Sequence, residues 1–280
     1  MPERGSSETC LYARQTWFLP AEGTDVIFGA SKRTLIVILA AAWVVWSVGA
    51  AFAQSGASLF DTKAQYAVLM DYESGTILFQ KNADAHMEPA SMAKLMTLAV
   101  VFNQLRNKKI SLDDEFFISE HAWRTGGAAS GSSTMFAVLN SKVPVIDLLR
   151  GVIVQSGNDA AIALAEGVGG SEQVFASMEN QLARQIGLTN SHFTNASGLP
   201  DPQMYTTARD LAVLARYLIR NFPEYYPMFA ETEFTWNKIR QPNRNSLLEL
   251  GIGVDGLKTG HSDESGYGMG ASTNAGGRRL

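Results

Sequence analysis

The sequence predicts an α+β fold in which N-terminal and C-terminal segments form an antiparallel sheet and a helical subdomain is inserted between them. Strand-like runs flank a glycine-containing turn within residues 65–81, and strand-like runs return at residues 233–273. Between these segments, apolar residues recur every three or four positions, as they do in amphipathic helices. Hydrophobic residues make up 46% of the 280, so the chain can bury a sizeable core and is not wholly disordered.

The first fifty residues have the layout of a leader for export. Residues 34–50 read TLIVILAAAWVVWSVGA, an uncharged apolar run that follows two basic residues and precedes Ala-Phe-Ala. This order is typical of a secretory signal peptide, so we assign 1–53 to a signal peptide region and 54–280 to the folded domain. The alternative is an uncleaved transmembrane anchor, because the apolar run is close to the shortest that spans a bilayer. We favour cleavage, because the small-x-small pattern stands where a signal peptidase cuts.

Composition excludes several kinds of function. The net charge is −4 and no long basic run occurs, which argues against binding nucleic acid through its phosphates. Cys10 is the only cysteine and belongs to the predicted leader, so the domain has no thiol for a disulfide, a cysteine metal cluster or cysteine catalysis. The four histidines are scattered and form no metal-binding motif, so we expect neither a metal nor another cofactor.

The predicted elements begin with a hairpin, whose turn contains Glu73-Ser74-Gly75. Pro89 then precedes the first helix, in a position that favours a helix start. Ser171 and Thr207 are placed as N-caps, and Asp210 completes a capping-box-like pair with Thr207. The predicted helices are residues 91–106, 144–154, 159–168, 171–186 and 207–220.

Strand signals dominate the last fifty residues. The predicted strands are residues 233–236, 254–259 and 267–273, and Asn274 to Gly277 reads as a turn. The sequence stops at Leu280, three residues into what reads as another strand. We therefore expect a fragment in which the C-terminal part of the domain is missing.

Ser91 and Lys94 form an S-x-x-K motif at the predicted start of the first helix. Residues three apart on a helix share a face, so the two side chains can approach hydrogen-bonding distance. A serine hydroxyl becomes a nucleophile when a neighbouring base takes its proton. Lysine can be that base if burial or another cation lowers its pKa. The structural alternative is a capping serine beside a solvated lysine.

Two further motifs follow in the chain. Ser156-Gly157-Asn158 lies between two predicted helices, where the serine could relay protons and the asparagine could bind an amide. Lys258-Thr259-Gly260 lies on a predicted strand, where Lys and Thr could bind a carboxylate and Gly leaves room for a substrate. The non-functional alternatives are an ordinary turn for Ser156-Gly157-Asn158 and an edge strand protected by lysine for Lys258-Thr259-Gly260. The three motifs occur in this order by chance with a probability on the order of 10⁻³.

S-x-x-K, S-G-N and K-T-G together resemble the D-alanyl-D-alanine carboxypeptidases, the low-molecular-mass penicillin-binding proteins of the bacterial envelope. The resemblance implies a β-lactamase/transpeptidase-like fold, and it covers most of the chain from about 64 to 273. The similar segments are 67–71 (AVLMD), 89–94 (PASMAK), 151–160 (GVIVQSGNDA), 187–190 (GLTN), 207–210 (TARD), 234–245 (FTWNKIRQPNRN) and 254–260 (VDGLKTG).

The resemblance implies catalytic roles for three residues. Ser91 would attack the carbonyl of the penultimate D-Ala of a peptidoglycan pentapeptide stem, and Lys94 would be the general base. Ser156 would pass a proton to the leaving amine. Water would then hydrolyse the acyl-enzyme, and β-lactam antibiotics would acylate Ser91 covalently by the same route.

The resemblance also implies a substrate-binding set. Lys258 and Thr259 would bind the terminal carboxylate, and Asn158 the peptide amide. The backbone N–H groups of Ser91 and His261 would form the oxyanion hole. The remaining expected binding residues are Gly260 and Arg244.

The family resemblance implies an exported protein of the periplasm, at the outer face of the inner membrane. A C-terminal β-rich domain and a membrane-tethering helix are usual in the family, and such a tether would lie outside this sequence. A serine β-lactamase is the alternative function, but nothing around Glu166 resembles the loop that activates the deacylating water in class A enzymes. A third possibility is a non-enzymatic scaffold. The presence of Ser91, Lys94 and Lys258 argues against it.

Overall fold

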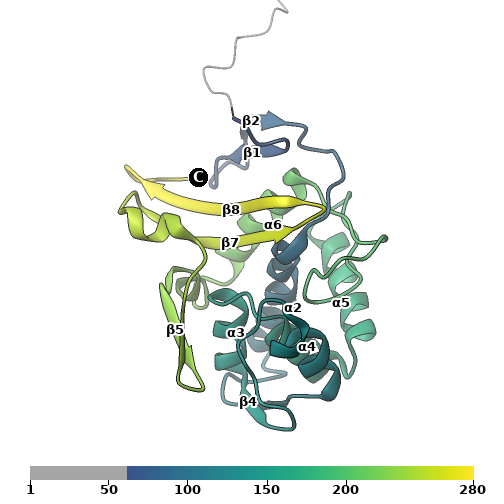
Figure 1. The fold of residues 1–280 in the computed structure, drawn as a ribbon. Helices are drawn as coiled ribbons and strands as arrows, with labels where there is room; N and C mark the ends of the chain where they lie inside the picture. The colour runs from purple at the N-terminus through teal and green to yellow at the C-terminus, as the bar shows by residue number, and fades with distance from the viewer. Residues whose placement is uncertain (1–61) are drawn as a thin grey trace, which may run out of the picture. The chain divides into compact units, whose positions relative to one another are not determined.

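The computed structural model describes residues 62–280, which form an α+β fold as predicted (Figure 1). The predicted signal peptide region lies outside the described residues. The helices are α2 (Lys94–Arg106), α3 (Val145–Ile153), α4 (Asn158–Gly169), α5 (Glu172–Gln185) and α6 (Ala208–Asn221). Short helical turns are η1 (Ala90–Ala93), η2 (Ala122–Gly126), η3 (Ala128–Ser130), η4 (Tyr226–Ala230) and η5 (Ser246–Leu250). All five predicted helices are present, with bounds that differ by a few residues.

The strands pair as antiparallel units. They are β1 (Ala67–Met70), β2 (Ile77–Lys81), β3 (Glu115–Phe117), β4 (Lys142–Pro144), β5 (Glu233–Trp236), β6 (Ile239–Pro242), β7 (Val254–Ser262), β8 (Gly266–Ala275) and β9 (Arg278–Arg279). β1 pairs with β2, β3 with β4 and β5 with β6, while β7, β8 and β9 form a three-stranded sheet. The short strands β3, β4 and β6 were not among the sequence predictions, since each has only three or four residues.

The N-terminal and C-terminal strands do not form one continuous ladder. They meet through a hydrogen bond from the Tyr72 N–H to the Arg279 carbonyl (3.1 Å) and an ion pair between Arg278 and Asp71 (2.8 Å). β9 contains only two residues, so little backbone is available for a ladder with β1. The N-terminal and C-terminal segments of the described residues are thus in contact, as predicted, although β1-β2 and β7-β8-β9 are two separate antiparallel sheets.

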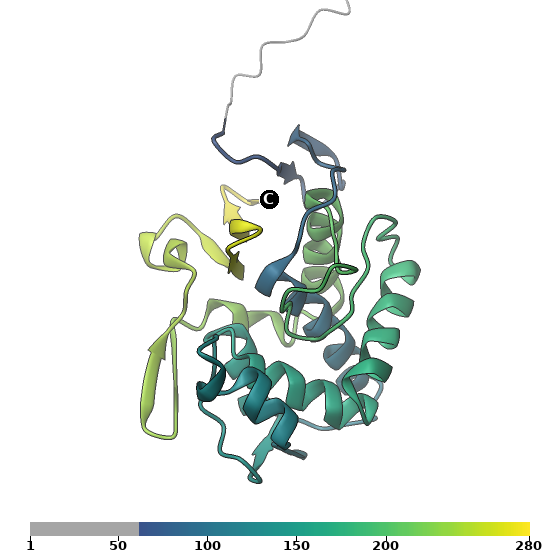
Figure 2. The same ribbon diagram turned by 45° about the vertical axis from the view of Figure 1, so that its right-hand side comes forward.

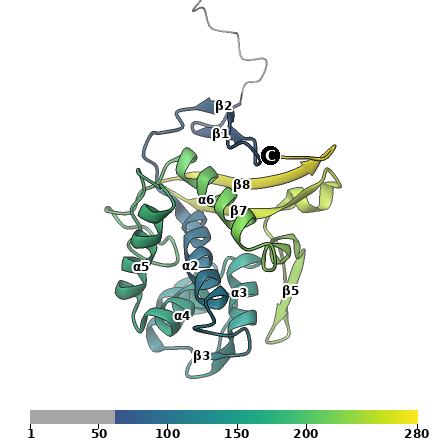
Figure 3. The same ribbon diagram turned by 180° about the vertical axis from the view of Figure 1, so that it is seen from behind.

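α2 forms the centre of the helical part. Most of its side chains are buried, including Leu95, Met96 and Phe102, and a helix that is apolar on all sides must be covered on all sides. Figures 1 and 3 place α2 between α3 and α5, and Figure 2 shows the same helices from another side. α6 covers the face of β7 and β8 that is turned away in Figure 1. The start of α2 is therefore held between the helices and the C-terminal sheet.

The predicted caps are present, with one difference. Ser171 Oγ accepts a hydrogen bond from the N–H of Val174 at 3.2 Å, and Thr207 Oγ1 accepts one from Asp210 at 3.1 Å. The Asp210 carboxylate does not complete the reciprocal capping box. It accepts instead from the Asn190 N–H (2.9 Å) and from the Ser191 hydroxyl (2.7 Å), because aspartate is shorter than the glutamate that usually reaches back.

Within residues 62–280, no helix is both long enough and apolar enough to span a membrane. The same residues contain no group of three or more histidine, cysteine, aspartate or glutamate side chains arranged to hold a metal ion.

Candidate active site

The three predicted motifs meet at one cavity of about 500 Å³. Its walls come from η1, from the loop before α4, from the segment before η5, and from β7 and β8. The lining residues are Ser91, Ser133, Ser156, Arg244, Thr259, Gly260, His261, Tyr267, Gly268 and Met269. Lys94, Asn158 and Lys258 lie behind this lining and are almost fully buried. The structure therefore places every predicted site residue in this cavity or directly behind it.

Lys94 is a buried lysine beside a serine that faces the cavity. Its side chain is 0% exposed, and its Nζ lies 2.9 Å from the Oγ of Ser91. Burial, followed by the nearby charges of Lys258 and Arg244, holds the pKa of Lys94 well below its usual value. The charge of Asp159 raises the pKa of Lys94, but this effect is smaller than the others. Burial and nearby cations, the two influences that favour the basic form of a lysine, therefore both act on Lys94.

The other partners of Lys94 decide where its lone pair points. Nζ lies 2.6 Å from Oδ1 of Asn158 and 2.5 Å from the carbonyl oxygen of Ser197, and both atoms can only accept hydrogen bonds. A neutral lysine has two N–H donors and one lone pair. When the two donors serve Asn158 and Ser197, the lone pair is directed at the hydroxyl of Ser91. The arrangement suits proton transfer from Ser91 to Lys94.

A second serine–lysine pair lies across the cavity. Lys258 on β7 is 2% exposed, and its Nζ donates to Ser156 Oγ at 2.9 Å and to the carbonyl of Thr259 at 2.9 Å. Burial and the charge of Arg244 lower the pKa of Lys258 to about 7. Ser156 has a φ of +58°, a conformation that is uncommon for a residue with a side chain. The alternative of a solvated lysine protecting an edge strand is thereby excluded.

Asn158 is the first residue of α4 rather than part of a free turn. Its Oδ1 accepts a hydrogen bond from Nζ of Lys94, and its Nδ2 donates to Ser132 Oγ at 2.9 Å. Both polar ends of this side chain thus have partners within the protein. Its contact with a substrate amide stays a prediction.

The remaining predicted residues also lie at the cavity. Arg244 donates from Nη1 to Ser133 Oγ at 2.7 Å, and burial lowers its pKa. The ring of His261 lies 4.1 Å from the ring of Tyr267, which is 91% exposed. Gly260 has a packing role that the sequence did not indicate, because a Cβ there would come 3.2 Å from the Cγ and N atoms of Met92. Its small size lets β7 pack against η1, besides leaving room at the cavity.

Asp159 is a functional-site residue that the sequence analysis missed. This buried carboxylate accepts from the N–H groups of Met135 (2.9 Å) and Ala137 (3.0 Å) and from the Thr134 hydroxyl (2.7 Å). It therefore holds the loop that follows Ser133 on the cavity wall. The only signal in the sequence was an acidic residue in the first turn of a predicted helix, which is common and not specific.

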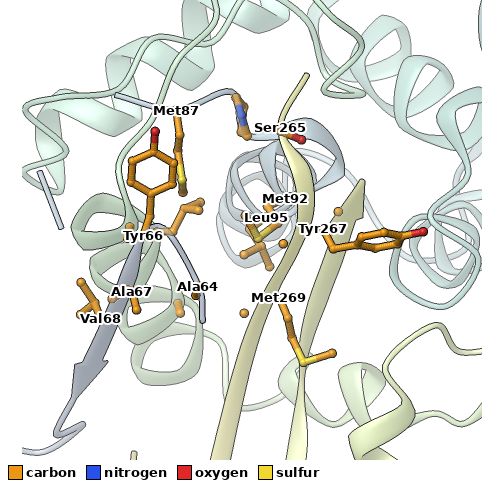
Figure 4. Close-up of a pocket in the computed structure, with 18 of the residues that line it drawn as sticks. Ala64, Tyr66, Ala67, Val68, Met87, Met92, Leu95, Ser265, Tyr267 and Met269 are labelled. Atoms are coloured by element: carbon orange, nitrogen blue, oxygen red, sulfur yellow. The ribbon is translucent and has the colours of Figure 1, made fainter. Parts of the chain in front are cut away.

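A second cavity, of about 450 Å³, is lined in part by β8 (Figure 4). Tyr66, Met87, Met92 and Leu95 line it together with residues of β8. Of the predicted site residues, only Gly260 contributes to its wall. It contains no serine–lysine pair and is therefore not the reactive site.

Comparison with known proteins places these observations in a family. The family model described as D-alanyl-D-alanine carboxypeptidase matches residues 51–280. The chain is 48% identical over 215 residues to the D-alanyl-D-alanine carboxypeptidase DacC of Escherichia coli, covering 76% of this chain and 54% of the relative. It is 45% identical to DacA of Haemophilus influenzae, covering 86% and 62%. The chain thus spans somewhat more than half the length of these relatives.

Solved structures agree with the sequence relatives. Penicillin binding protein 5 of Haemophilus influenzae superimposes with a TM-score of 0.77 at 46% identity, covering 80% of this chain and 65% of the other. Penicillin binding protein 6B of Escherichia coli gives a TM-score of 0.74 at 40% identity, covering 81% and 72%. These likenesses confirm the predicted fold class and its resemblance to penicillin-binding proteins.

Proposed function

Because the chain belongs to the D-alanyl-D-alanine carboxypeptidase family, we propose that it is a serine-type peptidase that removes the terminal D-Ala from peptidoglycan pentapeptide stems. The observation that carries this proposal is the buried Lys94, whose lone pair is directed at Ser91 by two acceptors. The family relatives are named for this activity.

Acylation begins with proton transfer from Ser91 Oγ to the neutral Nζ of Lys94, 2.9 Å away. The oxygen attacks the carbonyl carbon of the penultimate D-Ala, forming a C–O bond. The C–N bond to the last D-Ala then breaks, the leaving amine takes a proton from Ser156, and Ser156 is reprotonated by the proton that Lys94 took from Ser91. Lys258, 2.9 Å from Ser156, supplies a positive charge that favours the negative charge developing there.

Substrate binding uses the positive side of the cavity. Lys258 and Thr259 bind the terminal carboxylate of the stem, and Arg244 adds a second cation on the cavity wall. The backbone N–H groups of Ser91 and His261 stabilise the oxyanion of the tetrahedral intermediate. Asn158 orients Lys94 and contacts the peptide amide.

Hydrolysis completes the cycle. Water gives a proton to the again neutral Lys94 and attacks the acyl carbonyl carbon, the ester bond to Ser91 breaks, and Lys94 returns the proton to the Ser91 oxygen. A β-lactam acylates Ser91 by the same attack on its ring carbonyl, so the proposed partners include β-lactams as covalent inhibitors.

The β-lactamase alternative is not favoured. Its deacylating glutamate would have to face the cavity, but Glu166 lies near the end of α4 and does not line it. The relatives are named as carboxypeptidases.

We also propose that the protein is exported to the periplasm and acts at the outer face of the inner membrane. The apolar run at residues 34–50 and the Ala-Phe-Ala after it support export. Cell fractionation, with N-terminal sequencing of the exported protein, tests this placement; a start at Gln54 is expected.

One time course tests the activity. The full-length protein is incubated with a labelled penicillin and, separately, with a pentapeptide ending in D-Ala-D-Ala. We expect release of D-Ala and a long-lived penicillin adduct, both of which Ser91→Ala removes. Rapid penicillin turnover without release of D-Ala would reject the proposal.

A further inference from the structure

A carboxyl group that the mechanism does not use is buried behind the active site. Glu179 lies on α5, is 0% exposed, and places its Oε1 2.9 Å from the Oγ1 of Thr97 on α2. Its Oε2 has no hydrogen-bond partner among the residues that the structure describes. Burial raises the pKa of Glu179 well above its usual value, and the charge of Glu172 acts in the same direction. A charged carboxylate here would carry a large desolvation cost.

The hydrogen bonds of Thr97 require a proton on Glu179. Thr97 Oγ1 lies 2.7 Å from the carbonyl oxygen of Ala196, which can only accept. The single hydroxyl proton of Thr97 serves that carbonyl, so Thr97 must accept at its other contact. Thr97 Oγ1 can accept a hydrogen bond from Glu179 only if Glu179 is a carboxylic acid, whose O–H donates. The geometry thus agrees with the direction of the pKa shift.

This chain of hydrogen bonds ends beside the general base. Thr97 lies one helical turn after Lys94 on α2, and the two side chains hold two consecutive carbonyls: Thr97 binds that of Ala196, and Lys94 binds that of Ser197. The Ala196 N–H is held as well, since it donates to Oε1 of Glu172 at 3.0 Å. A shift of the peptide group after Ala196 would therefore move the Ser197 carbonyl away from Lys94.

We propose that Glu179 is a positioning residue for the reaction: as a carboxylic acid it donates to Thr97, Thr97 donates to the Ala196 carbonyl, and the Ser197 carbonyl is thereby held against Nζ of Lys94. The proposal rests on the proposed function, because Lys94 must be the base whose lone pair this carbonyl directs. Glu179 touches neither Ser91 nor the cavity, so it acts only through its neighbours.

Loss of this support has a consequence for the pH dependence of acylation. The charged groups that act on Lys94 are Lys258 of β7, Arg244 and Asp159 of α4, and none of them changes when Glu179 or Thr97 is replaced. The charged group that acts on Glu179 is Glu172, whose Oε2 lies 2.9 Å from Nε2 of His121. A carbonyl acceptor stabilises the ammonium form, so its withdrawal lowers the pKa of Lys94 further. The acid limb of the acylation profile then moves to lower pH, while the maximal rate falls because the lone pair is misdirected.

Two pairs of variants of the full-length protein test the proposal. One pair removes a hydrogen bond of the Glu179–Thr97–Ala196 chain while keeping side-chain size: Thr97→Val and Glu179→Leu. The other pair is conservative: Thr97→Ser keeps the hydroxyl, and Glu179→Gln keeps a neutral N–H donor. The measured quantity is the second-order rate of acylation by a labelled penicillin from about pH 5 to 9, divided by the fraction of molecules that can be acylated. We expect the removing variants to lose about 10- to 100-fold in maximal rate and to shift the acid limb downward. The conservative variants should stay within about threefold of the parent, with an unshifted limb.

The possible results separate the two proposals. If the parent protein is not acylated, the proposed function fails. If the parent is acylated and Thr97→Val or Glu179→Leu leaves the acid limb in place, Glu179 is merely structural and the inference is overturned, whatever happens to the rate. If Glu179→Gln behaves as Glu179→Leu does, a neutral donor is not sufficient and the inference is likewise overturned. If Thr97→Val or Glu179→Leu fails to fold, the acid limb of the other variant still tests the inference, because the two variants change different residues of the hydrogen-bond chain.

Discussion

The Nζ of Lys258 lies 2.9 Å from the Oγ of Ser156, although 102 residues separate them in the chain. Lys258 also lies close enough to Lys94 for its charge to lower the pKa of that lysine. Two buried lysines therefore share one cavity with two serines. The charge of Lys258 favours the neutral form of Lys94, as the proposed division into a cation and a base requires.

The first prediction concerns this division of roles. Replacing Lys258 by Gln removes a positive charge near Lys94, so the pKa of Lys94 rises and the acid limb of the penicillin acylation profile moves to higher pH. The acylation rate at neutral pH should fall at least tenfold, because carboxylate binding is lost as well. Rates measured from about pH 5 to 10 check this. Lys142→Gln, at an exposed position on β4, should leave the profile unchanged; an acid limb that stays in place in Lys258→Gln would contradict charge coupling.

The second prediction concerns stability. Lys258 has a folded-state pKa of about 7, against 10.5 in the unfolded chain. Between these values the unfolded chain binds a proton that the folded protein lacks, so the destabilisation grows as the pH falls from about 10.5 to 7 and is constant below. Lys258→Met should therefore raise the free energy of unfolding at pH 7 by a few kcal/mol, since one pKa unit corresponds to about 1.4 kcal/mol.

Denaturant unfolding of parent and Lys258→Met at several pH values measures this difference. The gain should shrink as the pH rises toward 10.5. Lys142→Met serves as the matched control, with no pH-dependent gain. A Lys258→Met protein that is less stable than the parent at pH 7 would show that the lysine is not a net cost to the fold.

The third prediction concerns Asp159. Replacing it by Asn puts N–H groups where acceptors are needed, and the N–H groups of Met135 and Ala137 lose a charged partner. We expect a loss of about 2–4 kcal/mol in the free energy of unfolding. Acylation should slow as well, because the loop next to Ser133 forms part of the cavity wall. Asp113→Asn, at an exposed position, is the control; equal behaviour of the two variants would disprove a role for Asp159 in holding the loop.

The fourth prediction concerns the close approach of Gly198 to η1. Gly198 has a φ of +73°, and a Cβ there would come within 1.9 Å of the carbonyl oxygen of Ala90. Gly198→Ala should therefore displace η1, which carries Ser91, and destabilise the fold by about 2–4 kcal/mol. Gly187→Ala meets open space at a similar φ of +83°, so it should cost only about 1 kcal/mol. Melting temperatures and acylation rates of both variants distinguish steric contact from backbone strain alone; similar effects would rule out the contact.

The local features were predictable because neighbouring residues decide them. The five helices follow from three- and four-residue spacing, and the hydroxyl caps at Ser171 and Thr207 act within one turn. The approach of Ser91 to Lys94 is of the same kind, since three residues separate them. β3 and β4 escaped prediction because each has three residues, too few for an alternating pattern to stand out.

The motifs by themselves also determined which chemistry to expect. The three motifs indicated Ser91 as the expected nucleophile, Lys94 as the expected base and Lys258 as an expected cation, because these roles depend on the chemistry of the side chain. Tertiary structure alone decided how these groups are tuned. The burial that lowers the pKa of Lys94, the contact between Lys94 and the Ser197 carbonyl, and the Glu179–Thr97 contact all join segments that are distant in the chain. A pKa depends on solvent exclusion and on charges a few ångströms away, and those distances exist only once the helices have packed against the sheet.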